Sequence, residues 1–192
     1  IALSSAFIYI TKYAIAGWGV LFLQKQHGFS LEEASQVIAF SAIFGVLGTV
    51  LAGWLSDTLF KSDRVKPAIL SGILSSLSLF LFLFVGGGFV MTIFYVSLFS
   101  LSVGVLYCIV AGLMAVDIVP RKATGAALGV VGISSYIAAG LQDIISGYLI
   151  QGYTQVVDGV DTYNFTPVSW FWAAASIISF VLPVLNWKKM KK

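Results

Sequence analysis

Two ionisable side chains stand inside long apolar stretches of the sequence, and their types and positions suggest chemistry. Lys12 interrupts the apolar run 7–18, and Asp143 lies within the run 123–150. A charge near the centre of a bilayer costs at least ~3 kcal/mol, so it persists where it faces a wet cavity or a partner. Two interpretations follow. Lys12 and Asp143 form a buried ion pair, or they line a cavity that receives a polar or anionic solute.

Tyrosines accompany these charges at the same expected depth. Tyr9 stands three residues before Lys12, which puts both on one face of a helix. Tyr107 and Tyr136 fall in the middle of two later apolar stretches. A hydroxyl at membrane depth needs a hydrogen-bond partner, which a phosphate or a sugar hydroxyl can supply. A bond to a neighbouring helix is the alternative for each tyrosine.

The composition is that of a membrane protein. Of 192 residues, 59% are hydrophobic and 10% are charged, against roughly 25% charged in soluble domains. The net charge of +3 lies in short connections and forms no patch suited to nucleic acid. The single Cys108 and the single His27 offer no basis for a disulfide, a metal site or a cofactor. Without a nucleophile–base or metal constellation, we expect no enzyme.

Six apolar stretches are long enough to cross a bilayer, since a helical span needs about 20 residues. Unbroken apolar runs of this length favour helices over barrel strands. The sequence therefore predicts an all-α membrane protein with six transmembrane helices. They are expected at 3–23, 34–55, 67–85, 89–116, 123–150 and 168–187.

Two features near the end of the chain are less regular. The polar connection 151–167 is interpreted as a tolerated loop insertion, with a small ordered cap as the alternative. Trp170, Trp172 and Trp187 stand near the ends of the last predicted helix. Tryptophan favours the membrane–water interface, so all three are expected to be anchors there.

The connections between the predicted helices differ in charge. One side carries a single basic residue, Lys25. The other side carries Lys61, Arg64, Lys66, Arg121, Lys122, Lys188, Lys189, Lys191 and Lys192. The positive-inside rule places the basic side in the cytoplasm, so both ends of this chain are predicted to be cytoplasmic. Because the chain begins without Met, we expect it to be part of a longer protein.

A spaced motif follows the second predicted helix. Gly53-x-Leu-x-Asp57 precedes a basic cluster that includes Arg64. The Asp57 carboxylate can pair with Arg64 and dock on the N-terminus of a neighbouring helix, although a simple loop salt bridge would use the same residues. The motif resembles the loop signature of the major facilitator superfamily, in the copy found in the second half of those transporters.

Two other segments are similar to the organophosphate:phosphate antiporter family of that superfamily. Tyr9-x-x-Lys12 with Trp18 resembles the Tyr-x-x-Arg…Asp-Trp pattern of the seventh helix. Residues 117–125 resemble the acidic-x-x-Pro-Lys-x-Ala-x-Gly segment before the eleventh helix. The likeness runs from residue 7 to residue 186. The chain is thus identified as the C-terminal six-helix half, helices seven to twelve, of such a transporter.

This resemblance implies an exchanger of hexose phosphate or glycerol phosphate for inorganic phosphate. Such a protein works by alternating access in a bacterial inner membrane, and its partner is the N-terminal six-helix half of the same transporter. The implied substrate-binding residues are Lys12, Tyr9, Tyr136, Asp143 and Tyr107. Lys12 supplies positive charge, the tyrosines supply hydroxyls, and Asp143 sets selectivity or neutralises Lys12 in the empty state.

The implied conformational gate consists of the loop residues whose contacts break and re-form as the transporter rocks. They are Gly53, Asp57, Arg64, Asp117 and Arg121.

Three departures from the family pattern leave the substrate open. Lys12 replaces an arginine, and lysine binds phosphate as a point charge without the bidentate fork. Gly17 replaces the acidic residue before Trp18, and residues 105–108 replace a Tyr/Phe-Gly-Pro motif. Two other functions remain as alternatives: a transporter-like membrane sensor of sugar phosphate, and a symporter of another polar solute that couples to protons through Asp143.

Overall fold

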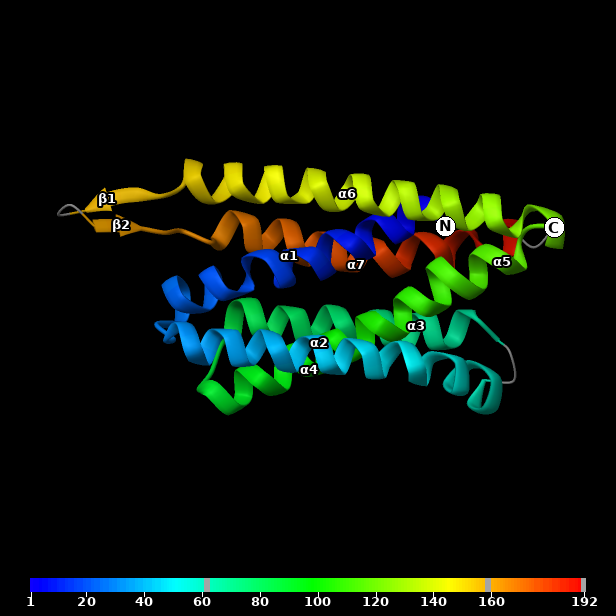
Figure 1. Ribbon diagram of the computed structural model, residues 1–192, viewed down its shortest axis with the longest axis horizontal. Helices are drawn as coiled ribbons and strands as arrows, with labels where there is room; N and C mark the ends of the chain where they lie inside the picture. Colours follow the sequence, from blue (N-terminus) through cyan, green and yellow to red (C-terminus); the bar gives the residue numbers. More distant parts are fainter. Residues whose placement is uncertain (61–62, 158–159, 191–192) are drawn as a thin grey trace.

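The computed structural model describes residues 1–60, 63–157 and 160–190. Within these ranges, six helices are long and apolar enough to cross a membrane. They run through α1 (Ala2–His27), α2 (Leu31–Trp54), α3 (Val65–Phe80), α4 (Phe89–Tyr107), α6 (Thr124–Gly152) and α7 (Thr166–Met190), all drawn in Figure 1. Adjoining short elements lengthen three of these spans, to Val65–Val85, Phe89–Asp117 and Arg121–Gly152. The fold class predicted from the sequence is confirmed.

Shorter elements extend or link these helices. The π-helical segments η1 (Leu55–Leu59), η2 (Leu81–Val85) and η3 (Cys108–Met114) continue α2, α3 and α4. The short helix α5 (Ala115–Asp117) and the 3-10 turn η4 (Arg121–Ala123) lead into α6. Strands β1 (Gln155–Val157) and β2 (Val160–Thr162) form an antiparallel hairpin between α6 and α7.

Local sequence signals set several helix ends. At Gly28, φ is 70°, a conformation that favours glycine, and the chain leaves α1 there. Ser30 then caps α2: its hydroxyl accepts from the Glu33 amide, while the Glu33 carboxylate accepts from the Ser30 amide. Gly86 ends η2 with φ at 66° and lies against the His27 ring, so it leaves no room for a side chain. These turns keep neighbouring helices antiparallel.

The helices pack as two groups of three. The first group joins α1, α6 and α7, and the second joins α2, α3 and α4. Figure 1 shows the first group above the second, with the hairpin at one end of the molecule and both termini at the other. We call these the hairpin end and the terminal end. Contacts of α3 with α7 and of α1 with α2 hold the two groups together.

The second group depends on very close approach of α2 to α4. A Cβ at Gly48 would lie 2.1 Å from the Leu101 carbonyl oxygen, and one at Gly104 would lie 2.5 Å from the Gly45 carbonyl oxygen. Helices in membranes approach this closely where glycines face each other. The largest fully buried side chains include Phe22, Phe82, Phe99, Phe165 and Trp172.

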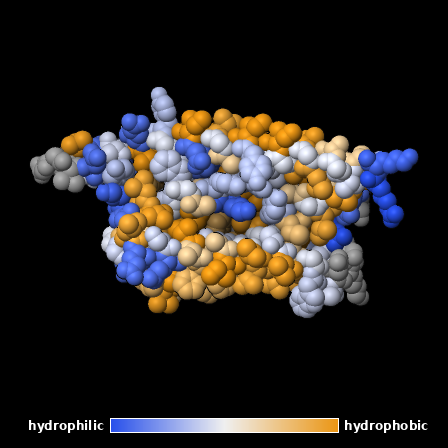
Figure 2. Space-filling model, in the orientation of Figure 1, coloured by the Kyte–Doolittle hydropathy of each residue, from blue (hydrophilic) through white to orange (hydrophobic). Residues whose placement is uncertain are grey.

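Two helices leave much of their surface uncovered. In the most apolar window of α2 only 17% of residues are buried, and in that of the α6 segment 22%, whereas the α4 segment reaches 61%. Figure 2 shows hydrophobic side chains along the two long edges of the molecule, over α6 and over α2 with α4. Between these edges the surface is hollowed and more hydrophilic.

The 151–167 connection contains the ordered hairpin β1–β2, as the alternative of an ordered element predicts, and its interpretation as a tolerated insertion stays a prediction. One expectation from the sequence needs correction. Trp172 is not an interfacial anchor: it is fully buried, and its indole N–H donates to the Ser146 hydroxyl at 2.9 Å. Trp170, by contrast, is 57% exposed.

Several charged residues of the topology argument fall outside the described part of the chain. These are Lys61, Lys191 and Lys192. The side chains of Asp57, Trp187, Lys188 and Lys189 also lie outside the description.

Candidate functional site

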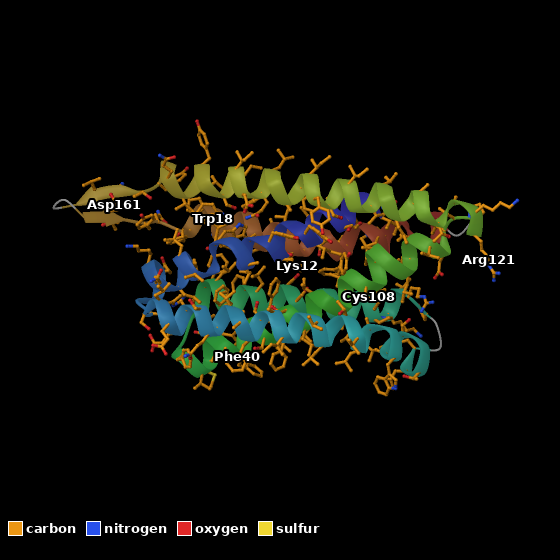
Figure 3. All side chains as sticks on the ribbon, viewed as in Figure 1. Lys12, Trp18, Phe40, Cys108, Arg121 and Asp161 are labelled. Atoms are coloured by element: carbon orange, nitrogen blue, oxygen red, sulfur yellow. The ribbon has the colours of Figure 1, made fainter. Side chains whose placement is uncertain are left out.

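Lys12 lies in the middle of α1 and points into the hollow between α6 and α2 (Figures 2 and 3). Its ammonium stands 5.6 Å from the ring centroid of Tyr9 and 5.4 Å from that of Tyr107. Both distances are within cation–π range, so the negative ring faces stabilise the charge. Helical spacing explains the first contact, because Tyr9 and Lys12 are three residues apart.

The rings around Lys12 form a cluster contributed by three helices. Tyr9 is 6% exposed, and its hydroxyl donates to the Tyr107 hydroxyl at 3.2 Å. The Tyr136 ring meets the Tyr9 ring edge-on at 5.3 Å, and Tyr13 stacks on Tyr9 at 5.5 Å. We call Tyr9, Tyr13, Tyr107 and Tyr136 the tyrosine cluster. The structure thus brings Lys12 together with the three predicted tyrosines.

Two cavities adjoin the cluster, and both have Thr49 and Tyr107 in their walls. One of about 300 Å³ lies among α1, α2 and α4 and contains Lys12, with Ser41 and Ser100 among otherwise small or apolar residues. The other, of about 350 Å³, reaches from Tyr9 to α6 along η3. A small polar molecule therefore has space beside the lysine.

Asp143 lies on α6 nearer the hairpin end, level with Gly17 of α1. A Cβ at Gly17 would stand 3.5 Å from the Asp143 carboxylate oxygen Oδ1. Gly17 is five residues beyond Lys12, or about 7.5 Å along the helix. In the described part of the chain, no ion pair within 4 Å joins Asp143 to Lys12. The ion-pair interpretation is therefore not realised in this conformation.

The chemistry that this arrangement supports is anion binding. Lys12 offers three N–H donors, and the tyrosine and serine hydroxyls offer more. Low surrounding polarity strengthens each of these interactions relative to water. Among the described residues, no group of three or more His, Cys, Asp and Glu side chains could hold a metal ion.

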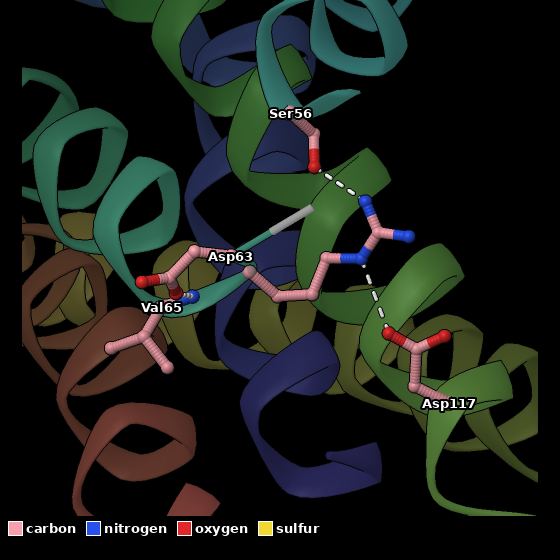
Figure 4. Close-up of polar contacts among 5 residues, drawn as sticks. Ser56, Asp63, Val65 and Asp117 are labelled. Carbon is pink, nitrogen blue, oxygen red and sulfur yellow. Dashed lines mark hydrogen bonds and ion pairs between the residues drawn. The ribbon is translucent and has the colours of Figure 1, made fainter. Parts of the chain in front are cut away.

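A second polar cluster occupies the terminal end of the bundle (Figure 4). The Arg64 guanidinium donates from Nε to Asp117 at 3.1 Å and from Nη1 to the Ser56 hydroxyl. These contacts tie the start of α3 to η1 and to α5. Asp63, its neighbour, accepts from the Val65 amide at 2.9 Å and pairs with Lys66 at 3.6 Å.

The other predicted gate residues are placed differently. Arg121 is exposed at the start of η4, and Figure 3 shows it directed away from the bundle. Gly53 lies near the end of α2, with no atom within 4 Å of the position that a Cβ would occupy. The Asp57 side chain lies outside the description, so its pairing with Arg64 stays a prediction.

Some members of the site were not found from the sequence. Tyr13 was missed, although its spacing of four from Tyr9 is a helical-face signal. Ser41 and Thr49 were also missed, and their spacing of eight with Gly45 between them marks one face of α2. Ser100 was missed as well, although Ser97, Ser100 and Gly104 stand at positions i, i+3 and i+7 of one face of α4.

Comparison with known proteins is consistent with this geometry. The family model of the Major Facilitator Superfamily matches residues 1–190. The glycerol-3-phosphate transporter of Bacillus subtilis is 28% identical over 195 residues, which cover 100% of this chain and 41% of that protein. The phosphoglycerate transporter protein of Salmonella typhimurium is 31% identical over 71% of this chain and 29% of its own length.

A third relative, a membrane sensor protein of Escherichia coli, is 31% identical over 70% of this chain and 30% of its own length. The chain thus spans less than half the length of these curated relatives. The chain belongs to the major facilitator superfamily, in which its relatives match the organophosphate:phosphate antiporter family, and it represents one six-helix half of such a protein.

Proposed function

We propose that this chain is the C-terminal half of a secondary transporter that exchanges a sugar phosphate, hexose phosphate or glycerol phosphate, for inorganic phosphate. The observation that carries the proposal is Lys12, an intramembrane cation held against tyrosine rings in an open hollow. Within the described residues it has no carboxylate partner, so a ligand anion is free to pair with it.

The site's chemistry suits a phosphoryl group. A phosphate offers several acceptor oxygens, and the Lys12 ammonium and the nearby hydroxyls are donors. The Tyr9 and Tyr107 ring faces stabilise the ammonium while the site is empty. An arriving phosphate replaces this weaker interaction with a direct charge pair. The tyrosine hydroxyls then orient the phosphate oxygens.

Exchange follows from the cost of moving an unpaired charge. When phosphate is bound, it offsets the desolvation of Lys12, so the loaded site can be enclosed more easily than the empty one. A carrier of this kind reorients mainly when loaded. Inorganic phosphate and a phosphate ester satisfy the same cation, which makes them exchangeable partners in alternating access.

The hollow requires a second wall. The exposed apolar faces of α2 and α6 flank it on both sides, and the relatives are more than twice as long as this chain. We assign that wall to an N-terminal six-helix half of the same protein. The names of the relatives, glycerol-3-phosphate transporter and probable hexose phosphate transport protein, support the substrate class.

The polar cluster of Arg64, Ser56 and Asp117, which we call the Arg64 cluster, is a candidate gate. In this conformation Arg64 links η1, α3 and α5 through Ser56 and Asp117. Helix ends that separate during rocking would have to break these bonds. We assign Gly53, Asp57 and Arg121 to the same conformational gate, on the cytoplasmic side of a bacterial inner membrane.

A sensor of sugar phosphate is the second candidate. It is favoured by the similarity to a membrane sensor protein, which covers 70% of this chain at 31% identity. A sensor binds the same ligand through the same lysine but carries little flux. Exchange measurements in liposomes separate the two functions.

The test uses the intact transporter in liposomes loaded with inorganic phosphate, with labelled glycerol 3-phosphate outside. Lys12→Ala removes a charge that pairs with phosphate away from water, a loss of ~2–5 kcal/mol. We expect exchange to fall by about thirtyfold or more, because each 1.36 kcal/mol is tenfold. Lys12→Arg should retain measurable exchange, since it keeps the charge.

The matched control is Lys122→Ala, which removes an exposed lysine in η4, just before α6. It should exchange like the unaltered protein. Normal exchange by Lys12→Ala would exclude the proposed phosphate site. Ligand binding without exchange by the unaltered protein would support the sensor and reject the transporter.

A further inference from the structure

The cavity of about 300 Å³ among α1, α2 and α4 has two serine hydroxyls in its wall besides Lys12. We call it the Lys12 cavity. One serine is Ser41 of α2 and the other is Ser100 of α4. Among the described residues of this wall, Lys12 alone carries a charge. The cavity thus has one cationic group and a small number of neutral polar groups in an otherwise apolar surface.

The two serines lie at one depth in the bundle, and Lys12 lies deeper. The hairpin ends of the three helices are level, because three residues separate α1 from α2 and the Phe29 ring lies 6.2 Å from the Phe89 ring. Ser41 is ten residues from the start of α2, Ser100 eleven from the start of α4, and Lys12 fifteen from the end of α1. At 1.5 Å per residue, the serines stand about 6 to 8 Å closer to the hairpin end than Lys12 does.

The hydroxyls of both serines are available to a ligand. Ser100 is 7% exposed, and neither its hydroxyl nor that of Ser41 makes a hydrogen bond within the described chain. Helical serines commonly donate to a carbonyl one turn back, as Ser35 does to Leu31 at 2.7 Å. A Cβ at Gly45, one turn from Ser41, would lie 3.9 Å from the Ser100 carbonyl oxygen, so both serines stand where α2 meets α4. A ligand that fills the cavity must supply their partner, because an enclosed hydroxyl without one is costly.

The wall between the serines and Lys12 offers no further polar partner to a ligand. Ala16 of α1, Ala42 of α2 and Val103 of α4 lie there. The described wall contains no carboxylate. A ligand ammonium at the serine end would therefore lose its hydration without gaining a counter-ion. The cavity suits a carbon chain that is uncharged beyond its anionic group.

We infer that the Lys12 cavity binds the carbon chain of a phosphomonoester, with the phosphate at Lys12 and a terminal hydroxyl of the chain at Ser41 and Ser100. The substrate class is a short ester whose far end is neutral and carries a hydroxyl, an ω-hydroxyalkyl phosphate. The inference rests on the proposed phosphate site at Lys12. It goes further by assigning the two serines to the far end of the substrate.

The experiment compares three competitors of labelled phosphate uptake into phosphate-loaded liposomes that contain the intact transporter. They are 3-hydroxypropyl phosphate, propyl phosphate and 3-aminopropyl phosphate, which differ only at the end of the chain. We expect 3-hydroxypropyl phosphate to inhibit at a concentration about fivefold or more below propyl phosphate, because the methyl end leaves the buried serine without a partner. It should also inhibit at a concentration about tenfold or more below 3-aminopropyl phosphate, whose ammonium is buried unpaired.

Ser41→Ala and Ser100→Ala, combined in one variant, identify where the terminal hydroxyl binds. The ratio of the inhibitory concentrations of propyl and 3-hydroxypropyl phosphate should fall to about one, because neither ester then has a serine to pair with. Since the ratio compares two ligands in one protein, a general loss of activity does not change it. The matched control is Ser35→Ala, an exposed serine of α2 outside the walls of both cavities. Its ratio should equal that of the unaltered protein.

Ala42→Leu provides a second test that does not depend on hydrogen bonding. The leucine would occupy the Lys12 cavity, so propyl and 3-hydroxypropyl phosphate should both lose about tenfold in affinity relative to inorganic phosphate, which has no carbon chain. The matched control is Ala39→Leu, another exposed alanine of α2, which lies in neither cavity wall. It should keep the affinities of the unaltered protein.

Two results would overturn the inference and leave the phosphate site intact. One is equal inhibition by propyl and 3-hydroxypropyl phosphate in the unaltered protein, and the other is an unchanged ratio when both serines are replaced. Stronger inhibition by 3-aminopropyl phosphate would also overturn it, because the chain would then end beside a carboxylate outside this cavity. Failure of inorganic phosphate itself to exchange would reject the proposed function, and the inference with it.

Discussion

At the residue scale, the site is organised by a lysine that lies against aromatic rings. An ammonium is compact and strongly hydrated, so it is costly to leave in an apolar cavity. Here the Tyr9 and Tyr107 rings face it at 5.6 and 5.4 Å. Tyr9 itself is fixed by its hydrogen bond to Tyr107 and by ring contacts with its other neighbours. The tyrosine cluster thus holds the Lys12 ammonium in place before a ligand binds.

Tyr136 is the cluster member most accessible to a ligand, at 62% exposure. Tyr136→Phe retains the ring contact with Tyr9 and removes only the hydroxyl. A hydrogen bond to a charged group contributes ~1.5–3 kcal/mol, so we predict that the KM for phosphate in liposome exchange rises about tenfold or more. Tyr148→Phe on the same helix, where Tyr148 is 81% exposed, should leave the KM unchanged. Equal KM values in all three proteins would show that the Tyr136 hydroxyl does not contact phosphate.

The sequence predicted the main residues of this site because charged and polar aromatic side chains are rare in apolar helices. Lys12, Tyr9, Tyr107 and Tyr136 were all placed at similar depth, and they do meet. The relation of Asp143 to Gly17 was beyond the sequence. It depends on how α6 is shifted and rotated relative to α1 in the packed structure. Small residues where the two helices meet would permit many such arrangements.

At the element scale, α1 and α4 each pack with helices of the other three-helix set. α4, from the last three helices, packs on α2 and α3, while α1, from the first three, packs on α6 and α7. This reciprocal pattern fits the inverted three-helix repeats within each half of these transporters. As a result α1 and α4 face each other across the Lys12 site, and α2 and α6 flank it.

The crossing of α2 and α4 offers a test of this packing. A methyl group at Gly48 would overlap the Leu101 carbonyl, and backbone atoms cannot move aside as a side chain can. Overpacking costs ~1–3 kcal/mol, whereas alanine gains ~1 kcal/mol over glycine in helix propensity. We predict that Gly48→Ala lowers the Tm of the intact protein in detergent by several degrees.

Gly129→Ala on α6 is the appropriate comparison. No atom lies within 4 Å of a Cβ at Gly129, so this variant should be neutral or slightly stabilising. If both variants melt at the same temperature as the unaltered protein, the close α2–α4 contact is incorrect.

Hydrophobic run length predicted the six helices, but it could not predict how they end. The π-helical segments η1, η2 and η3 continue apolar runs without any change of composition. The hairpin at Gln155–Thr162 has too few residues for strand alternation to stand out. Trp172 was misplaced because its indole finds a partner in Ser146 of another helix, which is a tertiary contact.

At the scale of the whole molecule, the charge distribution differs between the two ends. The Arg64 cluster lies at the terminal end, and the hairpin with Asp161 lies at the other (Figures 1 and 3). The exposed basic residues Arg121 and Lys122 also lie at the terminal end, in η4. Sequence alone predicted this asymmetry, because positive charge in short connections governs membrane orientation. It could not supply the second wall of the hollow, which we propose comes from an N-terminal half.

The orientation itself is testable in the intact transporter with single cysteines. Replacing the native Cys108 by serine gives a background without a thiol in this half, and any cysteines in the remainder of the protein are removed in the same way. Tyr153→Cys then reports the hairpin end, where Tyr153 is 52% exposed, and Lys122→Cys reports the terminal end.

A membrane-impermeant maleimide added to intact inner-membrane vesicles of right-side-out orientation should label Tyr153→Cys. It should label Lys122→Cys only after permeabilisation or in inverted vesicles, because the basic connections remain in the cytoplasm. The opposite labelling pattern would reverse the predicted orientation and would move the Arg64 cluster to the outer side, where it could not act as a cytoplasmic gate.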